Sequence, residues 1–69
     1  MINPLINAMK HWYNGDIEVY KAEVQNYLDN PVAVGEHGNL IETMDGLVAK
    51  IAEADEKLFI LEKYFGEDL

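Results

Sequence analysis

Apolar residues in the second half of the chain repeat at alternating intervals of four and three residues. This spacing places them on one side of an α-helix, whereas a half-buried strand would alternate every second residue. Asn39 is a suitable N-cap with Glu42 three residues later, and Gly66 is a suitable stop. The pattern predicts a helix over residues 40–65. Its apolar row, called the seam below, consists of Leu40, Met44, Leu47, Ile51, Ala54, Leu58, Leu61 and Phe65.

The first half carries a similar row, with a mean step close to a helical turn. Asn3 is a plausible N-cap, and Pro4 suits the first helical position, where no N–H is needed. The row keeps its phase through Gly15, so one helix over residues 4–28 with a kink at Gly15 is favoured over two helices with Asp16 capping the second. The seam of this helix consists of Ile2, Ile6, Met9, Tyr13, Ile17, Tyr20, Val24 and Tyr27.

Residues 29–39 contain Pro31, Gly35 and Gly38 and predict a loop. The expected fold class is therefore all-α, a single domain built as an antiparallel two-helix hairpin. Both helices also carry apolar residues outside their seams: Leu5, Trp12, Val19, Leu28, Ile41, Val48, Phe59 and Ile60. Such wide apolar surfaces need two neighbouring helices each, as in a four-helix bundle. We expect two copies to form that bundle, with an interface that includes Trp12, Val48, Phe59 and Ile60.

Composition supports self-association and excludes several other classes. The 69 residues include no cysteine, so no disulfide can stabilise a domain this small. A net charge of −8 and the absence of arginine disfavour direct binding to nucleic acid or anionic membranes, although Trp12, Tyr13, Tyr20 and Tyr27 resemble a base-stacking row. The longest apolar run is four residues, too short to cross a bilayer, and the start of the chain lacks the charge pattern of a secretory signal. We expect a cytoplasmic protein.

Part of the chain resembles short uncharacterised proteins of marine bacteriophages, especially those that infect cyanobacteria. The similarity spans about residues 20–60. It rests on the runs at residues 27–37, 41–42 and 47–54, in which Val34-Gly35-Glu36-His37 is the distinctive string. The resemblance implies a helical hairpin without a known activity, encoded by a phage and acting in the cytoplasm of its bacterial host.

Candidate chemistry is sparse. Serine and cysteine are missing, which removes two common nucleophiles, and no phosphate-binding glycine pattern occurs. Glu36 and His37 could act as a base or a metal ligand, but helix capping near residue 39 is the simpler interpretation. We therefore expect no enzyme, no cofactor and no metal site.

Two alternative functions follow from the acidic residues. The first is a decoy that occupies the basic surface of a host nucleic-acid-binding protein. The phosphate mimics would be Asp16, Glu18, Glu23, Asp45, Glu53 and Glu56. The second and weaker alternative is a Mg²⁺-dependent nucleotide hydrolase that uses the carboxylate pairs Glu42/Asp45 and Glu53/Glu56. Both pairs lie on one predicted helix, so a solvated acidic face is the simpler interpretation.

Overall fold

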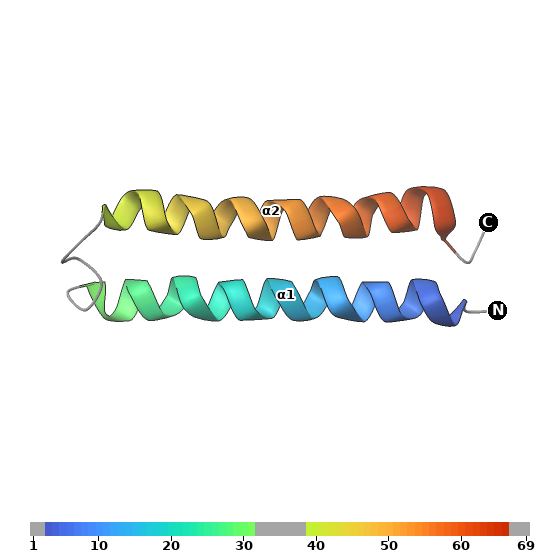
Figure 1. Ribbon diagram of the computed structural model, residues 1–69, viewed down its shortest axis with the longest axis horizontal. Helices are drawn as coiled ribbons and strands as arrows, with labels where there is room; N and C mark the ends of the chain where they lie inside the picture. Colours follow the sequence, from blue (N-terminus) through green and yellow to red (C-terminus); the bar gives the residue numbers. More distant parts are fainter. Residues whose placement is uncertain (1–2, 32–38, 67–69) are drawn as a thin grey trace.

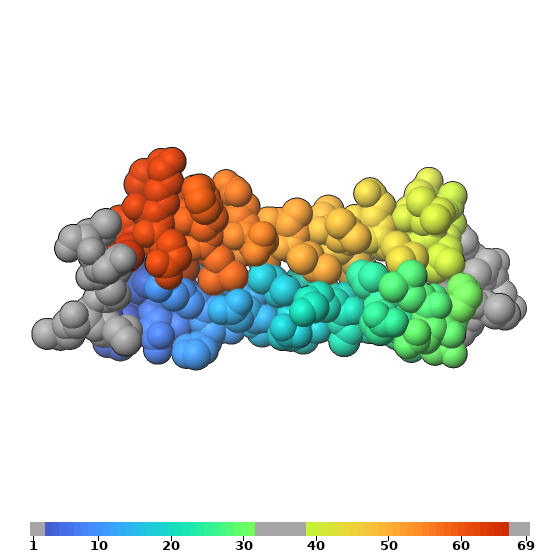
Figure 2. Space-filling view, turned by 180° about the vertical axis from the view of Figure 1, so that it is seen from behind, coloured from blue at the N-terminus to red at the C-terminus, as the bar shows by residue number. Residues whose placement is uncertain are grey.

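The computed structural model describes residues 3–31 and 39–66. Two helices of 26 residues each, α1 (Pro4–Asp29) and α2 (Leu40–Phe65), lie side by side and run in opposite directions (Figure 1). Their side chains meet along the length of the molecule (Figure 2). This arrangement confirms the all-α antiparallel hairpin. α1 extends one residue beyond the expected end, and the Glu36-His37 pair lies outside the described residues.

Both helices begin at an asparagine that satisfies early backbone donors. Asn3 Oδ1 accepts hydrogen bonds from the N–H groups of Leu5 at 2.9 Å and Ile6 at 3.3 Å. Asn39 Oδ1 accepts from the N–H groups two and three residues later at 2.8 and 3.2 Å. These N–H groups have no partner within the helix, which is why capping residues set where helices begin. Gly66 ends α2 in an extended conformation with φ −67°, so it does not use glycine's left-handed freedom.

α1 passes through Gly15 without interruption, and its ribbon shows no sharp kink (Figure 1). The predicted kink at Gly15 is therefore not observed. A glycine inside a helix costs about 1 kcal/mol relative to alanine, but the seam residues on both sides of Gly15 pack against the same partner helix. Breaking the helix would also expose backbone N–H and C=O groups, so a continuous helix is favoured.

The two seams face each other, but the core they form is thin. Only Ala54 at 5% exposure and Leu61 at 6% are buried among the described residues, and the other described seam residues are half-buried except Phe65. Phe65, expected to close the seam, is exposed because it lies in the last turn of α2, opposite the beginning of α1. Most of the described seam side chains therefore contact both protein and water.

The molecule is long and narrow. Its Cα radius of gyration is 15.6 Å, with extents of 50 × 15 × 14 Å, whereas a compact domain of this length has a radius of gyration of about 11 Å. An elongated pair of helices has a large surface relative to its volume. This geometry explains the thin core and determines which side chains are left at the surface.

Candidate functional site

The hairpin has two broad faces, which are defined by position relative to the seams. Successive helical residues are about 100° apart, so residues directly before a seam position lie on one face and residues directly after it lie on the other. We call these face A and face B. On face B, Lys10 of α1 forms an ion pair with Glu62 of α2. On face A, Asp16 of α1 lines the same hollow as Lys50 and Lys57 of α2.

The expected interface residues Trp12, Val48, Phe59 and Ile60 are all exposed. Their positions differ, however. Trp12 and Ile60 each precede a seam residue and belong to face A, whereas Val48 and Phe59 each follow one and belong to face B. One flat interface between two hairpins covers one broad face. The structure therefore does not bring the four candidates together.

A continuous apolar row runs along the outer edge of face A on α1. Large side chains occur every seven residues, and small residues alternate with them. Leu5 is 76% exposed, Trp12 67% and Val19 58%. The row, called the outer stripe below, consists of Leu5, Ala8, Trp12, Gly15, Val19 and Ala22. The sequence interpretation counted its large members as surplus but missed the small ones, although the same intervals of three and four residues connect all six.

Two features shape the outer stripe. A hollow of about 400 Å³ opens beside Val19 and Ala22 and is also lined by Glu23, Asn26 and Tyr27. At Gly15 the surface is open, since an added Cβ would meet nothing within 4 Å. The stripe therefore alternates protruding side chains with recessed positions. The Trp12 ring stacks on the neighbouring Tyr13 ring, with 6.1 Å between centroids and 14° between planes.

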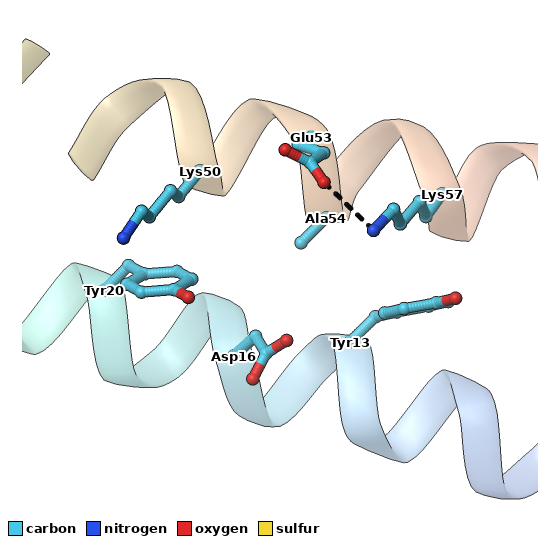
Figure 3. Close-up of a pocket in the computed structure, with 7 residues that line it drawn as sticks. All are labelled: Tyr13, Asp16, Tyr20, Lys50, Glu53, Ala54 and Lys57. Atoms are coloured by element: carbon cyan, nitrogen blue, oxygen red, sulfur yellow. Dashed lines mark ion pairs between the residues drawn. The ribbon is translucent and has the colours of Figure 1, made fainter. Parts of the chain in front are cut away.

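Face A also contains a polar hollow of about 190 Å³ at the middle of the hairpin (Figure 3). α1 contributes Tyr13, Asp16 and Tyr20, and α2 contributes Lys50, Glu53, Ala54 and Lys57. Each lysine Nζ lies 5.5 Å from a tyrosine ring centroid, Lys50 over Tyr20 and Lys57 over Tyr13. Two ammonium groups against two carboxylates give no net charge, so the hollow offers no strong attraction for a charged ligand.

Lys57 is the group in this hollow with a perturbed pKa. Its Nζ donates to Glu53 Oε1 at 3.0 Å. The hydrogen bond to Glu53 and the charge of that carboxylate raise the pKa of Lys57, with smaller contributions from Tyr13 and Asp16. The ammonium is thereby held in its charged form. Because the group is exposed and its partner lies on the same helix, this pair contributes little to the stability of the fold.

The acidic residues expected to mimic phosphates do not form one patch. Glu53 is paired with Lys57, and Glu18 lies 3.4 Å from Lys21 Nζ. Asp16 is half-buried in the polar hollow, while Glu23 borders the hollow beside the outer stripe. Asp45 and Glu56 are exposed on α2. A nucleic-acid mimic needs ordered rows of unpaired negative charge, and these positions are distributed around both helices.

The carboxylate pairs of the hydrolase hypothesis are likewise not assembled into a metal site. Within residues 3–31 and 39–66, no group of three or more His, Asp or Glu side chains is arranged to hold a metal ion. Glu42/Asp45 and Glu53/Glu56 remain separate exposed pairs on α2. His11 is exposed on α1. The described residues thus give the hydrolase hypothesis no geometric support.

Comparison of the chain with protein-family models, curated proteins and solved structures gives no match. The resemblance to phage proteins therefore gains no support from a relative, and what is shown is a two-helix hairpin of 69 residues. Neither of the two described helices is long and apolar enough to span a membrane.

Proposed function

We propose that this protein is a non-enzymatic helical interaction module that functions as a homodimer, in which two hairpins bring four helices together. The observation that carries the proposal is the exposed apolar surface of the hairpin. Ten large hydrophobic residues are substantially exposed among those the structure describes. Contiguous apolar surface on a small protein is typical of a site that binds another protein.

The surface area agrees with this proposal. The chain exposes 5388 Å², whereas a compact monomer of 7.9 kDa exposes about 4,400 Å². The difference is about 1,000 Å², and a stable interface between two proteins covers about 800 Å² on each partner. Pairing with a second copy would therefore give the chain the buried fraction of an ordinary small domain.

The small size of the chain and the thin core of the hairpin favour a second copy of the chain as the partner. A hairpin with two buried residues, Ala54 and Leu61, among those the structure describes has little core of its own, and domains of this length without disulfides or metals commonly depend on association. Closed pairs with two-fold symmetry are the commonest assemblies of identical chains. On the resemblance to phage proteins, we place this dimer in the cytoplasm of an infected bacterium.

Sedimentation equilibrium across micromolar concentrations tests the proposal. We expect a species with the mass of two chains that dissociates on dilution, and a midpoint of thermal unfolding that rises with protein concentration because folding and pairing are coupled. Helical circular dichroism recorded on the same samples shows that the chain is folded. A folded species with the mass of one chain at every concentration contradicts the proposal.

The acidic decoy is the second candidate, favoured by the net charge of −8. Its partner would be a basic protein held by charge, so the complex would weaken as salt screens the attraction. Capture of a nucleic-acid-binding protein from bacterial lysate at low salt, and its loss at high salt, would favour the decoy. Capture that does not respond to salt contradicts it.

A further inference from the structure

We infer that the two copies meet through the outer stripe of α1, with the two α1 helices antiparallel and the two-fold axis passing midway between residues 12 and 15. This inference rests on the proposed homodimer and specifies the surface and orientation that form it. The argument begins with the chemistry of the stripe. The six stripe positions between Leu5 and Ala22 carry no charged side chain, and the indole N–H of Trp12 is the one polar side-chain group among them. Removing the stripe from water therefore costs little in lost polar contacts.

Face B offers a weaker alternative. Ile41, Val48 and Phe59 form an apolar row there, but acidic residues interrupt it at the same helical spacing. Asp45 lies between the first two members of this row, and Asp55 lies between the last two. A second copy placed on face B would bury carboxylates of both chains against each other, which is costly unless each finds a cationic partner. The outer stripe carries no such cost.

The order of large and small residues selects the orientation. In an antiparallel pair centred between residues 12 and 15, each large side chain faces a small residue of the second copy. Leu5 lies opposite Ala22, Val19 opposite Ala8, and Trp12 opposite Gly15. A parallel pair would instead set Trp12 against Trp12 and Gly15 against Gly15, which crowds one level and leaves a gap at the next. Side chains in protein interiors fill space at near-crystalline density, so the antiparallel pair is favoured.

The surface of a single hairpin already contains the recesses that this pairing requires. The hollow beside Val19 and Ala22 lies where Leu5 of the second copy would enter. The open surface at Gly15 lies where the Trp12 ring of the second copy would enter. Small residues at intervals of seven also let two helices approach closely. This explains why a glycine is tolerated in the middle of a continuous α1, where alanine would be the better helix former.

Leucine substitutions at the two described helical glycines provide a matched test. A Cβ at Gly15 or at Gly46 meets nothing within 4 Å in the single hairpin, so both variants should fold. We expect Gly15→Leu to raise the dissociation constant of the dimer at least tenfold, because the new side chain occupies the space needed by Trp12. Gly46→Leu, on α2 and outside the stripe, should leave the dissociation constant unchanged. Sedimentation equilibrium measures both, and circular dichroism confirms that helicity is retained.

Cysteine pairs test the orientation, and the chain has no native cysteine to interfere. Under mild oxidation, the double variant Ala8→Cys/Val19→Cys should form covalent dimers, because the two positions face each other across the interface. Ala8→Cys alone should not. In the antiparallel pair its two copies are separated by about 17 Å along the helix axis, too far for a disulfide. In a parallel pair they would be adjacent and would link.

The outcomes distinguish a wrong interface from a wrong proposal that the protein is a homodimer. A dimeric wild type with a weakened Gly15→Leu variant, and covalent dimers from the double cysteine variant alone, supports the inference. A dimeric wild type whose Gly15→Leu variant pairs normally, or whose Ala8→Cys variant links by itself, overturns the inference and leaves the homodimer intact. A strictly monomeric wild type overturns both.

Discussion

Lys57 shows how one residue links the two helices without being buried between them. Its ammonium lies over the ring of Tyr13 on α1 and donates to Glu53 on its own helix. The attraction between a cation and the face of an aromatic ring is weak at an exposed site. Two such contacts between the helices on face A, Lys57 over Tyr13 and Lys50 over Tyr20, favour one alignment of the helices over its neighbours, although each contributes little to stability alone.

The raised pKa of Lys57 gives a direct test of this geometry. Because a raised pKa means that folding favours the charged form, the contribution is fully present below the ordinary lysine pKa of about 10.4 and is lost as pH rises through the folded value. In an NMR titration at alkaline pH, the Lys57 side chain should have a midpoint above that of an ordinary lysine. Glu53→Gln should lower that midpoint, because it weakens the hydrogen bond that is the largest cause of the raised pKa and removes the carboxylate charge that is the second.

Glu56→Gln is the matched control for this titration, since it removes a negative charge next to Lys57 in the sequence without removing the hydrogen bond. The Lys57 midpoint should respond less to this change than to Glu53→Gln. An equal response to both variants would mean that the general negative field of the protein, and not the specific pair, holds the proton on Lys57.

For single residues, the sequence predicts pairs within one helix better than it predicts contacts between the two helices. The spacing of Glu53 and Lys57 is sufficient to predict their pairing, because residues four apart lie on the same side of a helix. The placement of Lys57 over Tyr13 depends on the alignment of two helices connected by a loop, and no local pattern specifies that alignment. Phe65 was misplaced for a similar reason, since its seam spacing says nothing about where the partner helix begins.

The seams are the elements on which the hairpin depends. Ile51 lies in the middle of the α2 seam and is half-buried. Ile51→Asp places a carboxylate against the apolar side chains of α1, where it has no hydrogen-bonding partner, and burying a charge in this way is strongly destabilising. We expect loss of the helical circular dichroism signal at 25 °C, because a hairpin with so thin a core has no stability in reserve.

Ala52→Asp is the control, one residue away on the exposed side of α2. Both variants introduce the same charge, and Ala52→Asp costs more helix propensity than Ile51→Asp because alanine is the better helix former. Loss of the helical signal in Ile51→Asp alone would therefore report burial and not propensity. Ala52→Asp should keep its helical signal. If Ile51→Asp keeps its signal as well, the seam does not hold the helices together and the assignment of the core is wrong.

The elements themselves were predictable because they are specified locally. Intervals of three and four residues define an apolar side only in a helix, and Asn3 and Asn39 supply the acceptors that the first N–H groups need. The favoured single helix through Gly15 is confirmed, whereas the kink expected from the four-residue step between Tyr13 and Ile17 is not seen in Figure 1. Intrinsic propensity is a weak guide wherever packing extends on both sides of a residue.

At the scale of the whole molecule, the antiparallel packing of the two helices determines which apolar side chains share a face. The sequence showed surplus apolar residues, but the division into face A and face B requires the antiparallel packing of two helices. That packing places Trp12 and Phe59 on opposite faces. The spacing along α1 alone connects Trp12 to Ala8, Gly15 and Ala22, but only the placed hairpin shows that this row stays exposed after the two seams have met.

Charge opposes the proposed dimer, and this gives the last prediction. Each chain carries −8, so two copies repel each other while their apolar stripes attract. Salt shortens the screening length from about 10 Å at 0.1 M to about 3 Å at 1 M. We expect the dissociation constant measured by sedimentation equilibrium to fall several-fold over this range, opposite in sign to the effect on a complex held by charge.

A variant with less charge separates screening from the general strengthening of apolar contacts by salt. Asp45→Asn/Glu56→Gln removes two negative charges from exposed positions on α2, away from the outer stripe. It should pair more tightly than the wild type at 0.1 M salt and respond less to added salt, because there is less repulsion to screen. Equal salt dependence in both proteins would contradict a role for repulsion. A wild-type dimer that weakens with salt would mean that charged groups, and not the apolar stripe, hold the two copies together.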